Sequence, residues 1–160
     1  MAIAVFIARL LLGALLLVAG VLKAHDGPTA TAVTIAGFRI LPAAIVAPLG
    51  VALPYLEILL GGYLIAGLFT RVAALVAAFQ FAIFAAAVGS LVVRNISTNC
   101  GCFGSGVNTP PSWGHVAADL ALALVALAIA RFAPGVFAVD DRIGLTQGGS
   151  TPRHMEGSGR

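Results

Sequence analysis

Four long apolar stretches alternate with short polar connections along the chain. They cover about residues 3–22, 41–69, 72–93 and 113–132. Each reaches the roughly 20 apolar residues that a helix needs to cross a bilayer, and continuous apolar runs of this length are typical of membrane-spanning helices. The pattern therefore predicts an all-α integral membrane protein, a bundle of four transmembrane helices.

The first apolar stretch has a second interpretation, a signal peptide. It has no basic segment before the apolar run, and no convincing small-x-small cleavage site follows it. We therefore expect a retained first helix that ends at Lys23. Residues 29–40 are expected to form a short, moderately polar connection to the second helix.

The second apolar stretch contains Pro42, Pro48 and Pro54. A proline inside a helix removes a backbone hydrogen bond and bends the chain, although neighbouring helices in a membrane can cover the freed carbonyl. We expect an extended or broken start and then a main helix from about Ala47 to Leu68. Thr70-Arg71 is predicted to form a tight turn before the third helix.

Two polar segments complete the organisation. Residues 94–112 form the longest connection between spans, and they end at Ser112 and Trp113, which suit a helix N-cap and an interfacial anchor. Residues 134–160 are polar and rich in glycine, and we expect them to be disordered. The prediction is one transmembrane domain over residues 1–133, followed by a tail.

Composition supports this interpretation and limits the function. Of the 160 residues, 60% are hydrophobic and 9% are charged, and the mean hydropathy is +1.05. Soluble domains have about 45–50% apolar and about 25% charged residues, so an ordinary soluble enzyme is excluded. The net charge is +3, but the nine Lys and Arg residues are scattered, so we expect a lipid bilayer around the chain and no nucleic acid partner.

The distribution of basic residues predicts the orientation in the membrane. Four spans place both termini on one side. That side carries Arg71, Arg131, Arg142, Arg153 and Arg160, whereas the other side carries Lys23, Arg39 and Arg94. Because cytoplasmic segments are enriched in Lys and Arg, we expect cytoplasmic termini and an extracytoplasmic 94–112 loop, in the plasma membrane of a bacterium.

Arg9 and Glu57 fall inside predicted spans, where an unpaired charge is costly. At about 1.5 Å per helical residue, Arg9 lies about 21 Å and Glu57 about 24 Å below the outer face. At such similar depths the two can form an ion pair that joins the first two helices. A proton path or a ligand site is the other interpretation of these two residues.

Three further polar residues lie near the outer face. Arg94 closes the third helix, and His115 and Asp119 are four residues apart on one stripe of the fourth helix. We expect these side chains to support chemistry in the 94–112 loop. Helix capping and snorkelling to the interface form the alternative.

That loop holds the chain's two cysteines, Cys100 and Cys102, separated by one glycine. An intramolecular disulfide must join these two, and so short a loop makes a poor structural staple. A strained disulfide is more readily reduced and suits redox exchange, and a nearby Arg94 or His115 favours the reactive thiolate. Metal ligation, for which the chain offers few donors beyond His115, and two inert thiols remain as alternatives.

The sequence resembles the MauE proteins of methylamine utilisation, a branch of the DoxX-like four-helix membrane proteins. The resemblance covers roughly residues 5–132 and is carried by the following motifs: Arg94-Asn95, Cys100-Gly101-Cys102-Phe103-Gly104, Ser112-Trp113 and Asp119; Arg9, Leu11-Leu12, Ala19-Gly20, Lys23 and Asp26; Leu41-Pro42 and Leu53-Pro54-Tyr55-Leu56-Glu57. The resemblance implies a role in forming or handling disulfides in exported proteins, beside a thioredoxin-like extracytoplasmic partner or a disulfide-containing client.

The leading hypothesis is therefore a membrane thiol–disulfide exchanger with Cys100 and Cys102 as its catalytic residues. A non-catalytic accessory subunit of a larger respiratory or redox membrane complex is the alternative, because many small residues in the third and fourth helices permit close docking. A small-molecule transporter, dependent on Arg9 and Glu57, is a third hypothesis. The sequence requires no cofactor or metal, and although a quinone could accept electrons, no residue pattern calls for one.

Overall fold

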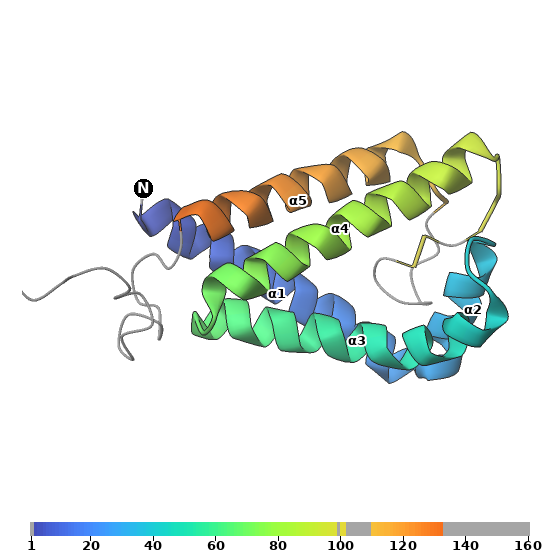
Figure 1. Ribbon diagram of the computed structural model, residues 1–160, viewed down its shortest axis with the longest axis horizontal. Coiled ribbons are helices and arrows are strands. Elements are labelled where there is room, and N and C mark those ends of the chain that lie inside the picture. The colour runs from blue at the N-terminus through green and yellow to red at the C-terminus, as the bar shows by residue number, and fades with distance from the viewer. Residues whose placement is uncertain (1, 99, 102–109, 133–160) are drawn as a thin grey trace, which may run out of the picture.

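The computed structural model describes residues 2–98, 100–101 and 110–132. These residues form five helices and no strand (Figure 1). The helices are α1 (Ala2–Asp26), α2 (Pro28–Gly37), α3 (Ala43–Ala66), α4 (Thr70–Val93) and α5 (Trp113–Phe132). Among the described residues, α1, α3, α4 and α5 are long and apolar enough to cross a membrane. The predicted all-α bundle with four spans is confirmed, whereas the predicted tail at residues 134–160 lies outside the described part.

The four long helices pack as two pairs, α1 with α3 and α4 with α5 (Figure 1). Glycines allow the first pair to approach closely: a Cβ atom at Gly61 would lie 2.7 Å from the carbonyl oxygen of Gly13, and one at Gly20 would lie 2.7 Å from that of Pro54. Small residues permit such backbone contact in membranes. These contacts place α1 antiparallel to α3, with Gly20 beside Glu57 and Gly13 beside Gly61.

Alanines fill the contact between α4 and α5. The buried alanines of these helices are Ala73, Ala74, Ala77, Ala78, Ala85, Ala123, Ala126 and Ala130. All of them except Ala85 join leucines of α1 and α3, including Leu16 and Leu64, in one apolar core. These small residues therefore serve the internal packing of the bundle.

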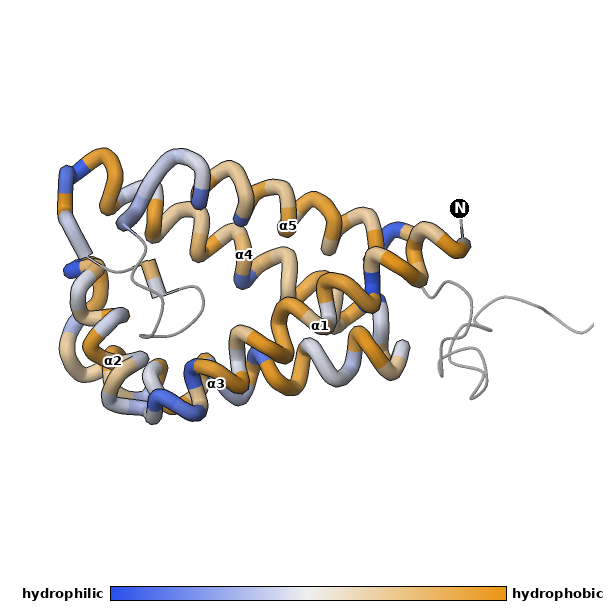
Figure 2. Tube along the Cα trace, turned by 180° about the vertical axis from the view of Figure 1, so that it is seen from behind, coloured by the Kyte–Doolittle hydropathy of each residue, from blue (hydrophilic) through white to orange (hydrophobic). Residues whose placement is uncertain are grey.

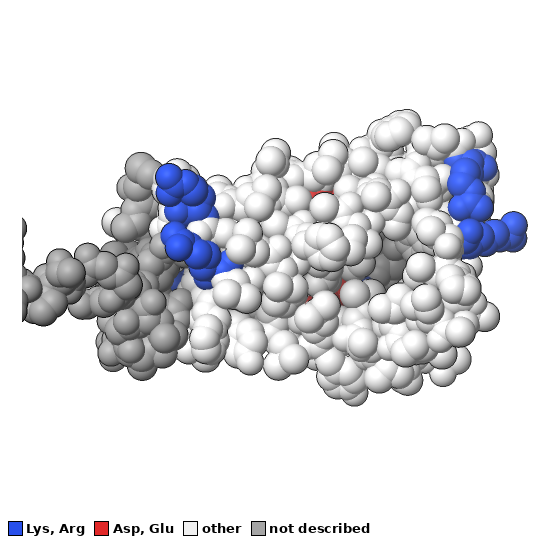
Figure 3. Space-filling model, viewed as in Figure 1, with Lys and Arg blue, Asp and Glu red and all other residues white. Residues whose placement is uncertain are grey.

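The outside of the bundle is apolar along its length and basic at its ends. Leu11, Phe79 and Leu124 are each about two-thirds exposed, and apolar residues alternate with few polar ones along the long helices (Figure 2). The visible Lys and Arg side chains gather at the two ends, leaving the flank between them free of basic groups (Figure 3). This distribution is that of a multi-pass membrane protein whose long axis crosses the bilayer.

The expected polar connection at 29–40 is wrong in part, because residues 28–37 form helix α2. Pro28 stands at the start of α2, where its fixed φ suits a helix and its missing N–H costs nothing. The helix packs on α3, where a Cβ atom at Gly50 would lie 2.7 Å from the Cβ of Ala32. The dipeptide Gly27-Pro28 is the feature of the sequence that indicates the start of this helix.

The expected extended or broken start of the second span is wrong in part: Pro42 is extended, but the helix begins at Ala43 and not at about Ala47. Helix α3 runs continuously from Ala43, directly after Pro42, and it includes Pro48 and Pro54. Pro54 cannot donate to the carbonyl of Gly50, and α2 packs on α3 at this glycine. A covering helix of this kind makes an internal proline tolerable in a membrane.

Candidate functional site

A buried polar cluster connects three of the long helices. The Nζ of Lys23, on α1, lies 2.6 Å and 2.8 Å from the two carboxylate oxygens of Glu57, on α3. Gln80, on α4, donates a hydrogen bond of 3.1 Å from Nε2 to Oε1 of the same glutamate. All three side chains are almost fully buried. Charges at such a position must be paired, so this cluster fixes α1, α3 and α4 against one another.

The predicted pair of Arg9 with Glu57 is wrong, because Glu57 pairs with Lys23. The depth estimate placed Lys23 at the outer face, but α1 continues to Asp26 and Lys23 is buried. Glu57 lies beside Gly20, about 16 Å along α1 from Arg9 at 1.5 Å per residue. The Arg9 guanidinium is buried and lies 5.4 Å from the ring centroid of Phe6.

A cavity of about 200 Å³ lies between the two helix pairs. Its polar lining comes from Glu57 on α3 and from His115 and Asp119 on α5. Asp119 is only 7% exposed, and its Oδ2 has no hydrogen-bond partner among the described residues. His115 is joined through Nδ1 to the Oγ of Ser112 at 2.8 Å. The structure thus brings His115 and Asp119 to one cavity, together with Glu57.

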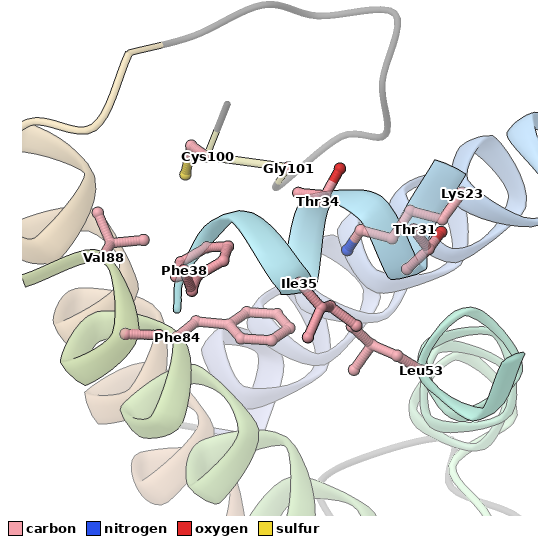
Figure 4. Close-up of a pocket in the computed structure, with 11 residues that line it drawn as sticks. Lys23, Thr31, Thr34, Ile35, Phe38, Leu53, Phe84, Val88, Cys100 and Gly101 are labelled. Atoms are coloured by element: carbon pink, nitrogen blue, oxygen red, sulfur yellow. The ribbon is translucent and has the colours of Figure 1, made fainter. Parts of the chain in front are cut away.

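A second pocket, of about 60 Å³, lies beneath Cys100 and Gly101. The other lining residues in the described part of the chain are Lys23 of α1, Thr31, Thr34 and Ile35 of α2, Phe38 directly after α2, Leu53 of α3, and Phe84, Ala87 and Val88 of α4. Figure 4 shows the sulfur of Cys100 on the side of Phe38 and Val88 and the Lys23 amine on the opposite side. We call this space the thiol pocket. Cys102 lies outside the described residues.

Helix α2 forms the surface on which the cysteine loop rests. Gly101 has a φ of +70°, and a Cβ atom there would collide with the side chain of Thr34. Thr34 is held by a hydrogen bond of 3.1 Å from its Oγ1 to the carbonyl of Ala30. Only glycine fits both the left-handed backbone and the contact. Cys100 is buried here, at 5% exposure, although it belongs to a polar connection.

Arg94 binds the end of α2. Its Nη1 donates a hydrogen bond of 3.1 Å to the carbonyl oxygen of Phe38. The residue itself follows the last turn of α4 and is exposed. This contact is of the capping kind that the sequence left open, and thiolate support by Arg94 stays a prediction.

Sequence reasoning missed three residues of the site, Lys23, Thr34 and Gln80. Lys23 stands three residues before Asp26 and was interpreted as a charge at a helix end. Thr34 belongs to a helix that was not predicted. Within the residues described, no group of three His, Cys, Asp or Glu side chains is arranged to hold a metal ion.

Comparison with known proteins identifies the family. Residues 1–132 match the model of the family described as methylamine utilisation protein MauE. The chain is similar to the methylamine utilization protein MauE of Paracoccus denitrificans, with 36% identity over 98 residues, which cover 61% of this chain and 53% of the relative. The match thus spans about half the length of that curated relative, and no solved structure matches the chain. Since the family match covers all four spanning helices and the cysteine loop, the chain belongs to the MauE family.

Proposed function

We propose that this protein exchanges disulfides with an extracytoplasmic partner through Cys100 and Cys102. The observation that carries the proposal is the position of Cys100 at the thiol pocket, which the Lys23 side chain also lines from the opposite side. The thiolate is the reactive form of cysteine, and an ammonium group favours it where the two come close. In the structure this ammonium contacts both carboxylate oxygens of Glu57.

The surroundings of Cys100 support this chemistry. Apolar side chains of Ile35, Phe38, Phe84 and Val88 line most of the pocket, and charges interact more strongly where water is excluded. Gly101 supplies the left-handed backbone that a turn between the two cysteines needs. The backbone at Gly101 is the feature that supports a close approach of the two cysteines.

The exchange balances without a cofactor. Starting from a Cys100–Cys102 disulfide, a thiolate of the partner attacks one sulfur, forms a mixed disulfide and releases the thiolate of the other cysteine. The second partner thiolate then attacks the mixed disulfide, which leaves the partner oxidised and both cysteines reduced. Two electrons pass from the partner to this chain, and the two partner protons end on the cysteines or in solvent. The reverse sequence reduces the partner.

We further propose where the protein acts. The relative's name refers to methylamine utilisation, and we assign this chain to the same process, acting on an exported disulfide-containing protein beside a thioredoxin-like partner. The cysteine loop then faces the extracytoplasmic side of a bacterial plasma membrane, and the termini face the cytoplasm. Oxidising compartments of this kind permit disulfides.

The accessory-subunit hypothesis is the second candidate function. It rests on small residues in the third and fourth spans. Ala73 and Ala123 are buried within the bundle, whereas Ala117 and Ala121 are exposed and available for docking. An accessory subunit should tolerate the loss of either cysteine with its assembly intact.

The redox state of the two cysteines in native membranes tests the proposal. A membrane-impermeant alkylating reagent is applied before and after mild reduction, and the mass shift of the protein is measured. We expect labelling of both cysteines from outside only after reduction, and a trapped mixed disulfide with a thioredoxin-like protein in Cys100→Ser or Cys102→Ser. Ser97→Ala is the matched control in the same connection. A disulfide that resists reduction, or thiols that stay unlabelled throughout, overturns the proposal.

A further inference from the structure

The cavity between the helix pairs, lined by Glu57, His115 and Asp119, has no role in the proposed exchange. It lies in the bundle, with polar groups at one part of an otherwise apolar lining. We propose that this cavity is a binding site for a small primary ammonium ion, with the Asp119 carboxylate as its principal partner. The proposal is independent of the disulfide chemistry.

Asp119 interacts electrostatically with His115 and Lys23, but its Oδ2 receives no hydrogen bond from the described residues. The Lys23 ammonium gives two contacts to Glu57, and the Gln80 amide adds a third. Glu57 is thereby satisfied. Asp119 is 7% exposed, and its Oδ2 has no hydrogen-bond partner among the described residues. A buried carboxylate in this condition is costly, so the site favours a bound cation.

The unpartnered atoms near the cavity favour a ligand that donates hydrogen bonds. They are the Oδ2 of Asp119 and, in the adjoining cluster, the Oε1 of Gln80. Both are acceptors. Of the neighbouring groups, the Lys23 amine and the Gln80 amide are directed to Glu57. His115 is joined through Nδ1 to Ser112. A primary ammonium group brings three N–H donors and a positive charge. A neutral donor such as a hydroquinone places no positive charge in contact with Asp119.

The walls suit the organic part of such an ion. Phe81 and Phe84 line the cavity together with aliphatic side chains of α1 and α5, and aromatic faces attract cations. The volume of about 200 Å³ exceeds the need of one water molecule many times over. Acidic atoms are visible between the helices on the flank shown in Figure 3, in an otherwise uncharged surface. A short alkylammonium ion therefore fits the shape, the charge and the donor requirement.

Calorimetric titration of the purified full chain in lipid nanodiscs tests this site. Methylammonium and ethylammonium are the probes, and tetramethylammonium, which has no N–H donor, is the matched ligand control. We expect saturable one-site binding of the two primary ions and none of tetramethylammonium. Asp119→Asn should weaken binding about tenfold or more, as expected for loss of a charge-assisted hydrogen bond. Asp26→Asn, at the end of α1, should bind as the unmodified chain does.

A second variant tests the site independently, in case the Asp119→Asn protein does not fold. Ala118→Phe retains the carboxylate but places a ring at the cavity wall, and it should also abolish binding while helix content by circular dichroism is unchanged. Absence of saturable binding by the unmodified chain overturns the proposal. Binding of methylammonium that survives in both variants also overturns it. The same holds if potassium and tetramethylammonium bind as tightly as methylammonium, because this indicates a non-specific cation effect.

Discussion

The two halves of the bundle differ in what fills them. Toward the Arg71 and Arg131 end, the space between the helices holds an apolar core of leucines and alanines, with Leu64, Ala74 and Ala77 fully buried. Toward the Arg94 end, it holds the Lys23–Glu57–Gln80 cluster, Asp119, both cavities and the added helix α2. Close packing therefore stabilises one half, and the other half carries the groups capable of chemistry.

This contrast follows from the cost of polar groups in a membrane. The apolar half is closely packed, and the charged group buried there is Arg9, whose guanidinium lies 5.4 Å from the ring centroid of Phe6. The polar half is stable only because most of its charges and donors are paired. Stability should therefore be lost for different reasons in the two halves. In the polar half it is lost when a charged group loses its partner, and in the apolar half when a substitution overpacks the helix contacts.

The largest effect is expected from Lys23→Met in the polar half. It leaves the Glu57 carboxylate buried with only the Gln80 amide as a partner, and breaking a buried pair this way costs about 3–5 kcal/mol. Thermal unfolding in detergent, followed by circular dichroism, measures the loss. The double variant Lys23→Met with Glu57→Leu should regain most of it, because two apolar residues replace the whole pair. A single variant as stable as the unmodified chain contradicts the assigned pairing.

A smaller effect is expected from Gly61→Ala in the contact of α1 and α3. The new Cβ would lie 2.7 Å from backbone atoms of Gly13 and Leu17, so the helices must move apart, at a cost of about 1–3 kcal/mol. Gly62→Ala is the matched control, because a Cβ atom there meets nothing within 4 Å. Equal stability of the two variants in the same unfolding measurement refutes the close helix contact.

The smallest effect on stability is expected from Gly101→Ala in the cysteine loop. The residue has φ +70° and faces Thr34, and a left-handed conformation costs a non-glycine residue about 1–2 kcal/mol. After mild reduction, we expect faster alkylation of Cys100 because the loop no longer packs on α2, with global unfolding almost unchanged. Gly27→Ala, also at positive φ but with open space around it, controls for backbone strain. Unaltered alkylation shows that α2 does not hold the loop.

The spanning helices and the type of candidate chemistry can be inferred from the order of the amino acids alone. Hydropathy and length identified all four spans, and the residue range predicted for the last, 113–132, matches α5. The spacing of Cys100 and Cys102 and the motifs around them indicated the MauE family, which the comparison shows. The wider DoxX-like placement and the orientation in the membrane stay predictions. These features are local, so a single stretch of chain carries their signal.

Which side chains come into contact is seen only once the helices are packed together. Lys23, not Arg9, pairs with Glu57, because backbone contact at Gly13, Gly20 and Gly61 sets the register of α1 on α3. Helix α2 reaches the cysteine loop because it folds back on α3 at Gly50. Each of these contacts joins residues far apart in the chain. Hydropathy does not indicate how one apolar helix is aligned against another, because this alignment depends on close packing between the two helices.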